Sequence, residues 1–148
     1  MAFRYKLEAL LRLQRSIEHQ EENRLLACVA RIVSLKDDLQ VWNEARLHRR
    51  RNALGDLEKG SPGIFLRFAE EWDQAARARV KEILQQLKVA EEARLQQLKI
   101  YRAARQKREV LESLRERQQS AYTVEQLRRI QQGLDETHLI RSFYWGNR

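Results

Sequence analysis

Apolar residues recur along most of this chain at intervals of three and four positions, the spacing that places them on one face of an α-helix. A shorter stripe, Leu10, Leu13 and Ile17, precedes the main one in a different register. The step from Ile17 to Cys28 predicts a stutter in the supercoil, and the polar stretch EHQEENR within it predicts weak packing. The main stripe is a strict heptad formed by Leu25, Cys28, Ile32, Leu35, Leu39 and Trp42.

A second stripe begins near residue 65, and neither Pro nor Gly interrupts the chain from there until Gly133. Hydrophobic periodicity over such lengths is typical of coiled coils. We therefore expect one helix over about 5–58 and another over about 64–140. The second stripe contains Phe65, Phe68, Trp72, Val80, Ile83, Leu87, Ala90, Tyr101, Ala104, Leu111 and Leu114.

The stretch KGSPGI, residues 59–64, holds the only proline of the chain. Gly60 can adopt the left-handed conformation that ends a helix, Ser61 can cap the next one, and Pro62 suits a first helical turn. A short connection between long helices makes them antiparallel neighbours. The predicted fold class is all-α: a single coiled-coil domain over 1–148, built as a long two-helix antiparallel hairpin with its tip at 59–63 and an overhanging C-terminal helix.

The overhang follows from counting outward from the tip, which places the amino terminus opposite about residue 115. The stretch from there to about residue 140 would extend roughly 37 Å without a partner if it is helical. Thr123 with Gln126 could form a capping box that restarts the helix. Facing pairs in this register are Leu35 with Leu87, Trp42 with Val80, and Leu11 with Leu111. Apolar residues of the overhang that a two-stranded rod cannot bury are Val124, Leu127, Ile130, Leu134 and those of HLIRSFYW.

Composition and charge narrow the possible partners. The charged fraction of 34% suits a coiled coil or a disordered chain, and the recurring Leu, Ile and Val favour the coiled coil. One cysteine, Cys28, permits no internal disulfide and fits a reducing cytoplasm. We find no signal peptide and no apolar run near the roughly 20 residues that span a bilayer. The net charge of +8 makes nucleic acid, an anionic membrane surface or an acidic protein face plausible partners.

Enzymatic chemistry is not indicated, and we expect no catalytic, cofactor-binding or metal-binding residues. His19, His48 and His138 are scattered, and Asp135 with His138 reads as a surface pair rather than a metal site. The basic stretches 46–51 and 99–117 could grip phosphates. They lack interleaved aromatic residues and a reading motif, so a solvated helix face with i, i+4 ion pairs is the favoured interpretation.

Four aromatic residues lie near the expected tip: Trp42, Phe65, Phe68 and Trp72. They are bulky for a two-stranded seam. Two interpretations stay open, an exposed binding hot spot and a small core that braces the tip.

Both ends of the chain resemble the FliJ family of flagellar type III export proteins. FRYKLEALLRLQRSIEHQEE (3–22) is similar to the family's opening, a Phe-Arg-aromatic stretch followed by Leu-Glu, a leucine-rich turn and a polar run. AYTVEQLRRIQQGLDETHLIRSF (121–143) is similar to its ending, in which Leu-Asp-Glu precedes an Arg-x-Phe. Length, charge and hairpin layout agree along the whole chain, whereas YWGNR and the Gly-Pro-rich tip fit no family pattern.

The resemblance implies a cytoplasmic coiled coil, peripheral at the cell membrane, that resembles the central stalk of rotary ATPases. It implies three partners: the hexameric export ATPase, the cytoplasmic domain of the export gate and export chaperones. By position on the hairpin, and not by matched family residues, we expect the gate contact near the four tip aromatics. The expected ATPase-binding end comprises Leu7, Leu11, Leu127, Arg128, Arg129 and Leu134.

Three alternatives remain open at this point. The nearest is the equivalent stalk protein of a virulence type III secretion injectisome. A second, from another class, is a basic coiled-coil factor that associates with nucleic acid or ribosomes. A third is a structural adaptor that dimerises through its overhang.

Overall fold

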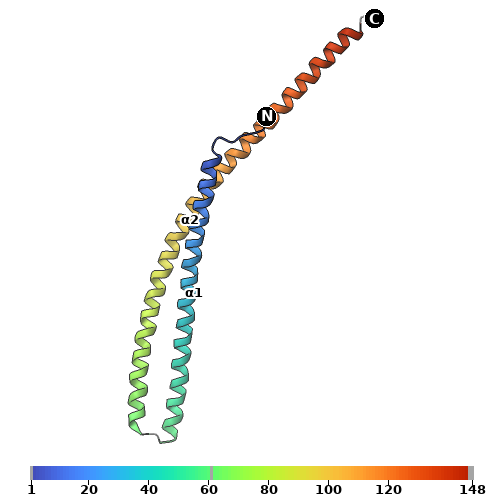
Figure 1. Ribbon diagram of the computed structural model, residues 1–148. Coiled ribbons are helices and arrows are strands. Elements are labelled where there is room, and N and C mark those ends of the chain that lie inside the picture. The colour runs from blue at the N-terminus through green and yellow to red at the C-terminus, as the bar shows by residue number, and fades with distance from the viewer. Residues whose placement is uncertain (1, 61, 147–148) are drawn as a thin grey trace. The chain divides into compact units, whose positions relative to one another are not determined.

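Two long helices account for almost the whole fold. The computed structural model describes residues 2–60 and 62–146. Helix α1 (Glu8–Glu58) has 51 residues, and helix α2 (Gly63–Trp145) has 83. They are joined by a short turn and run antiparallel, as Figure 1 shows. The chain is therefore an all-α two-helix hairpin with an overhanging C-terminal helix, as the hydrophobic pattern predicted.

Both helices differ slightly from their predicted bounds. Helix α1 begins at Glu8 rather than near residue 5, because residues 2–5 have no regular secondary structure and a turn at residues 6–7 follows, in which the Glu8 N–H donates to the Tyr5 carbonyl at 3.3 Å. Helix α2 continues to Trp145, past the expected end near residue 140. The proposed capping box at Thr123 is wrong, since α2 runs through it unbroken and the Thr123 hydroxyl donates to the Gln119 carbonyl at 3.0 Å.

The turn uses glycine as expected. Gly60 has a φ of +77°, the left-handed region that a residue without Cβ adopts readily, and its N–H donates to the Leu57 carbonyl at 3.1 Å. Pro62 immediately precedes α2 rather than lying in its first turn, and its carbonyl accepts the Phe65 N–H at 3.0 Å. The predicted cap, Ser61, lies outside the described residues.

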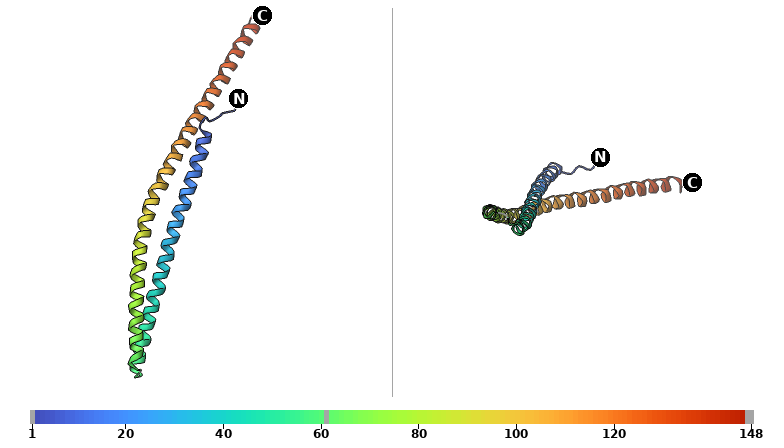
Figure 2. Two further views of the ribbon diagram at one scale, coloured as in Figure 1. Left: turned by 60° about the vertical axis from the view of Figure 1, so that its left-hand side comes forward. Right: turned by 90° about the horizontal axis from the view of Figure 1, so that it is seen from below.

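Contacts within the chain group it into two compact units. We call His19–Arg102 the hairpin unit, and residues up to Glu18 together with those from Ala103 onward the open-end unit. In the hairpin unit the arms of α1 and α2 run side by side, as Figure 1 and the left view of Figure 2 show. Its apolar seam is centred on Ile32, Leu35, Ala76 and Ile83, and that of the open-end unit on Tyr5, Leu11 and Ala104.

The predicted stutter in α1 is wrong. Leu10 and Leu13 are 40% and 55% exposed, whereas Leu11 is fully buried. From Leu11 the inward-facing positions recur at intervals of three and four without a break, through Gln14, Glu18 and Glu21 to the heptad that starts at Leu25. A search for apolar residues alone misses this continuity, because polar side chains occupy three consecutive seam positions.

Candidate functional site

The non-helical segment before α1 is held against α2 in the open-end unit. Tyr5 is 5% exposed, and its hydroxyl donates to the Leu111 carbonyl at 3.0 Å. The Phe3 and Tyr122 rings lie 5.6 Å apart. The paired region therefore reaches Tyr122 rather than ending near residue 115 as predicted. Non-helical backbone can advance up to about 3.3 Å per residue against about 1.5 Å in a helix, so the residues before α1 can cover more of α2 than a helix of the same number of residues.

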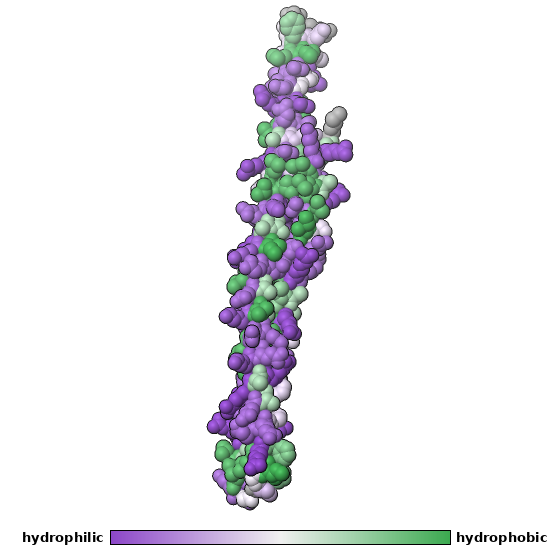
Figure 3. Space-filling view, turned by 90° about the vertical axis from the view of Figure 1, so that its left-hand side faces the viewer, coloured by the Kyte–Doolittle hydropathy of each residue, from purple (hydrophilic) through white to green (hydrophobic). Residues whose placement is uncertain are grey.

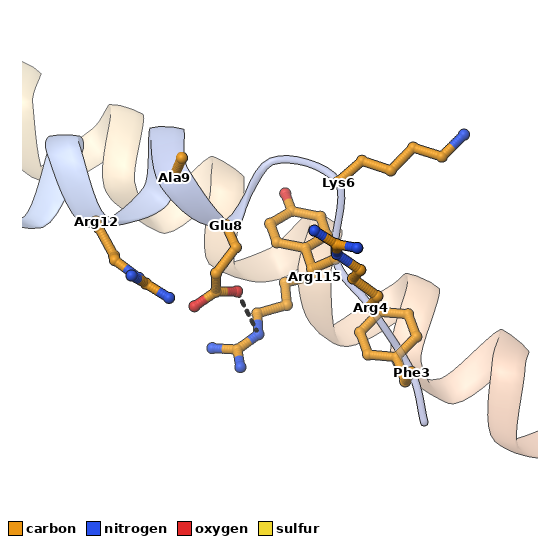
Figure 4. A pocket seen from close by; sticks show the side chains of 8 residues that line it. Phe3, Arg4, Lys6, Glu8, Ala9, Arg12 and Arg115 are labelled. Atoms are coloured by element: carbon orange, nitrogen blue, oxygen red, sulfur yellow. Dashed lines mark ion pairs between the residues drawn. The ribbon is translucent and has the colours of Figure 1, made fainter. Parts of the chain in front are cut away.

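A cationic hollow lies beside this segment (Figure 4). Arg115 Nε lies 3.4 Å from a Glu8 carboxylate oxygen, the one ion pair drawn among the lining residues. Four cationic side chains therefore accompany a single carboxylate, which favours an acidic partner over a basic one. The hollow is lined by Phe3, Arg4, Tyr5, Lys6, Glu8, Ala9, Arg12 and Arg115.

Next to the hollow, charged residues replace apolar ones in the seam. Arg15 donates to a Glu112 carboxylate oxygen from Nη2 at 2.9 Å and from Nε at 3.1 Å. Arg108 donates to Glu18 and to Glu112. The Arg15 hydrogen bond, helped by Arg108, lowers the pKa of Glu112, and the Glu18 hydrogen bond raises the pKa of Arg108. These four residues therefore link α1 and α2 through ion pairs.

Glu21 makes a similar contact in the hairpin unit. Its side chain is buried, and Gln97 donates to its carboxylate at 2.6 Å and to its backbone carbonyl at 3.1 Å. Arg24 donates to the other carboxylate oxygen at 2.7 Å. Because the Gln97 amide donates to both the side chain and the backbone of Glu21, this contact fixes the register of α1 against α2 in this unit.

The overhang is the most exposed apolar surface of the open-end unit. From Leu127 to Gly146 every described side chain is exposed. Continuing the inward-facing heptad from Tyr122 leads to Arg129 and Glu136, which are polar. At about 100° per residue, Leu127, Ile130 and Leu134 lie about 80° to 140° around α2 from Tyr122, on a different face of the helix. The overhang thus carries a separate apolar surface, which we call the outer stripe and define as Leu127, Ile130 and Leu134.

The predicted ATPase-binding residues include both exposed and buried side chains. Leu127, Arg128, Arg129 and Leu134 are all exposed on the overhang, and Leu7 is 38% exposed. Leu11 was the wrong choice for a surface contact, since it is fully buried in the seam. Arg129 donates to Glu125 at 3.0 Å, one turn earlier on α2.

The tip aromatics fall into two pairs. Trp42 and Trp72 stack with ring centroids 6.3 Å apart, and the Arg49 guanidinium lies 4.3 Å above the Trp72 ring. These three residues brace the hairpin unit. Phe65 and Phe68 are instead 59% and 61% exposed, so the bracing interpretation holds for the tryptophans and the surface interpretation for the phenylalanines.

Arg46 supplies a further brace that the sequence reading missed. It donates to Asp73 at 3.1 Å, and Arg77 contacts the same carboxylate at 2.7 Å. The hydrogen bond from Arg46 lowers the pKa of Asp73. The sequence does carry a signal for this contact, since Arg46 and Arg49 continue the three-and-four spacing that starts from Trp42.

Other candidate chemistry finds no support in the described ranges. No group of three or more His, Cys, Asp or Glu that could hold a metal occurs within residues 2–60 and 62–146. Asp135 accepts a hydrogen bond from Gln131 at 3.0 Å instead of joining His138 in a site. In the same ranges no helix is long and apolar enough to cross a membrane. No protein-family model, curated protein or solved structure matches the chain.

Proposed function

We propose that this protein is a non-enzymatic, stalk-like component of the flagellar type III export apparatus. Its open end binds the hexameric export ATPase and promotes assembly and activity of the ring. The observation that carries this proposal is the overhang, a helical extension whose apolar side chains have no partner within the described chain. The motifs at both ends of the sequence support the same family.

The open end offers two features that suit a protein ring. The outer stripe supplies apolar contact area, with Leu127, Ile130 and Leu134 between 58% and 61% exposed. The cationic hollow adds positive charge, which would favour acidic residues on the partner. We assign the ATPase contact to Leu7, the outer stripe, Arg128 and Arg129.

The other proposed contacts are with the export gate and with export chaperones. Within the tip, Phe65 and Phe68 are the aromatic residues free to make them, since Trp42 and Trp72 are occupied with each other and with Arg49. The protein would then act at the cytoplasmic side of the cell membrane.

ATP hydrolysis by the purified export ATPase, titrated with this protein, tests the proposal. We expect stimulation that saturates near a ratio of about one chain per ring, because a single stalk occupies a central pore. Truncation after Gln126 and the charge reversal Arg128→Glu/Arg129→Glu should each weaken the effect. The matched control is Arg50→Glu/Arg51→Glu, which reverses two adjacent exposed charges far along the chain from the overhang. Full activity of both open-end variants would refute the assignment.

The injectisome stalk shares this architecture, and titrating an injectisome ATPase in parallel separates the two systems. A nucleic-acid factor is disfavoured by a specific observation: Arg15, Arg46 and Arg108 form ion pairs with carboxylates across the two helices. If the chain binds RNA tightly, with affinity falling steeply as salt rises, and leaves the ATPase unaffected, the proposal fails.

A further inference from the structure

A patch of apolar side chains surrounds the turn of the hairpin. Figure 3 shows it as the hydrophobic surface at the lower end of the molecule in that view. Each side chain in it is between 36% and 61% exposed. We call it the tip patch, and its members are Leu54, Leu57, Ile64, Phe65, Leu66 and Phe68.

The tip patch is exposed because the seam ends before it. The buried residues nearest the turn on the two arms are Leu35 and Ala76. Between them and the turn the helices are held by the stacked tryptophans and by Arg46 with Asp73. Beyond those braces no described side chain of the hairpin is buried, so nothing in the described chain covers the patch.

Cations accompany the tip patch. Between Leu47 and Phe68 the chain has five Lys and Arg residues against two carboxylates, Asp56 and Glu58. Arg50, Arg51, Lys59 and Arg67 are exposed and form no ion pair among the residues that the structure describes. The long stems of such side chains can lie along apolar surface while their charges reach anionic groups.

From this combination we propose that the tip patch inserts into the surface of an anionic lipid bilayer. Exposed Phe and Leu side chains flanked by Arg and Lys are the composition of segments that lie in the bilayer interface. The patch surrounds the end of a hairpin, so its side chains can enter a fluid layer together without a matching groove. The inference does not depend on the proposed ATPase contact, but it gives the membrane the two phenylalanines, Phe65 and Phe68, that the proposed function assigns to the export gate and chaperones. Direct contact with the gate protein is the competing use of the same patch.

Sedimentation of the purified full chain with vesicles tests the inference without any other protein. One vesicle preparation is phosphatidylcholine alone and the other also contains phosphatidylglycerol. We expect binding to the second preparation only, weakening as salt is raised, because salt screens charges at the membrane surface. Equal binding to both preparations, or to neither, would overturn the proposal.

Two pairs of matched variants assign the binding to the tip. Phe65→Ser/Phe68→Ser should reduce binding at least tenfold, whereas Leu127→Ser/Leu134→Ser, which changes equally exposed side chains on the overhang, should leave it unchanged. Arg50→Gln/Arg51→Gln should reduce it by about fivefold for each arginine, and Arg128→Gln/Arg129→Gln should not. Losses of equal size at the overhang would contradict a tip site.

Insertion is distinguished from adsorption by a probe at the patch. In a Cys28→Ala background, Phe68→Cys carries an environment-sensitive dye, whose emission should shift to the blue when phosphatidylglycerol vesicles are added. The same dye at Leu134→Cys should not shift. Binding by charge alone, with no shift at position 68, would refute insertion. If the chain does not bind vesicles, and Phe65→Ser/Phe68→Ser abolishes binding to the gate protein, the tip patch is a binding site for the gate protein instead.

Discussion

Replacing Arg108 by methionine should reveal how much the polar seam stabilises the open-end unit. The Arg108 side chain is 20% exposed and contacts Glu18, which is 14% exposed, and Glu112, which is 29% exposed. Methionine keeps most of the aliphatic volume and removes the charge. Glu112 would retain Arg15, but Glu18 would be left as a largely buried carboxylate without a cation.

The expected loss can be bracketed from these burial values. Hydrogen bonds to charged groups contribute about 1.5–3 kcal/mol, and exposed ion pairs contribute about 0–1 kcal/mol. Since Glu18 is mostly buried and Glu112 keeps a partner, we expect Arg108→Met to lower the free energy of unfolding by about 2 kcal/mol. A matched control is Arg79→Met, because within residues 2–60 and 62–146 Arg79 forms an ion pair with Glu82 alone, on its own helix, and the two side chains are 41% and 56% exposed. That control should change the free energy by less than about 0.5 kcal/mol.

Urea unfolding followed by circular dichroism measures the free energy, and amide hydrogen exchange locates the change. Exchange should quicken in 8–18 of α1 and in 103–118 of α2, and less elsewhere. The double variant Glu18→Gln/Arg108→Met should recover part of the loss, because the stranded carboxylate is gone. If Arg108→Met and Arg79→Met lower the free energy of unfolding by the same small amount, the polar seam stabilises the protein no more than a surface ion pair does, and the reasoning fails.

Three further outcomes are expected. The folded-state pKa of Glu112 is lowered, so the stability that its ionised form contributes is present above the pKa of an unfolded glutamate and is lost as pH falls through the lowered value. The melting temperature measured against pH should therefore fall over this range, and the fall should be smaller in Glu112→Gln. Leu35→Ala, at a side chain 2% exposed, should lower the free energy of unfolding by about 2–4 kcal/mol, against under about 0.5 kcal/mol for Leu95→Ala at 50% exposure, both by urea denaturation. Truncation after Gln126 should leave the melting temperature of the remainder within about 2 °C, because it removes exposed side chains only, and a larger fall would show that the overhang packs on the hairpin.

Helical periodicity and turn chemistry were sufficient to predict the fold class. Leu35 and Ile83 are buried as their heptads required, and Gly60 ends α1 in the left-handed conformation. Both features depend on local spacing and on conformational preferences, which a sequence displays directly. The helix bounds were less accurate at the amino terminus, where Tyr5 is held by a hydrogen bond to a residue far along the chain.

The sequence-based predictions were wrong where polar residues occupy seam positions that apolar residues usually fill. Glu18 and Glu21 occupy seam positions, yet each is acceptable there only because Arg108 or Gln97 faces it from α2. A pairing of that kind cannot be inferred until the register of the two helices is known. Leu11 was assigned to the surface by its position near the open end, although the predicted register already placed it opposite Leu111, and it is fully buried.

The same polar seam separates stability from binding. Arg15, Glu18, Arg108 and Glu112 join α1 to α2 in the open-end unit through ion pairs that satisfy one another. The outer stripe lies on a different face of α2 from the seam, and the tip patch lies past the last contact between the helices, the pair Trp42 and Trp72 with Arg46 and Asp73. A partner at either surface therefore need not displace α1 from α2. It follows that variants of the outer stripe and of the tip patch should alter binding without altering folding, and that each surface can be tested while the other serves as its control.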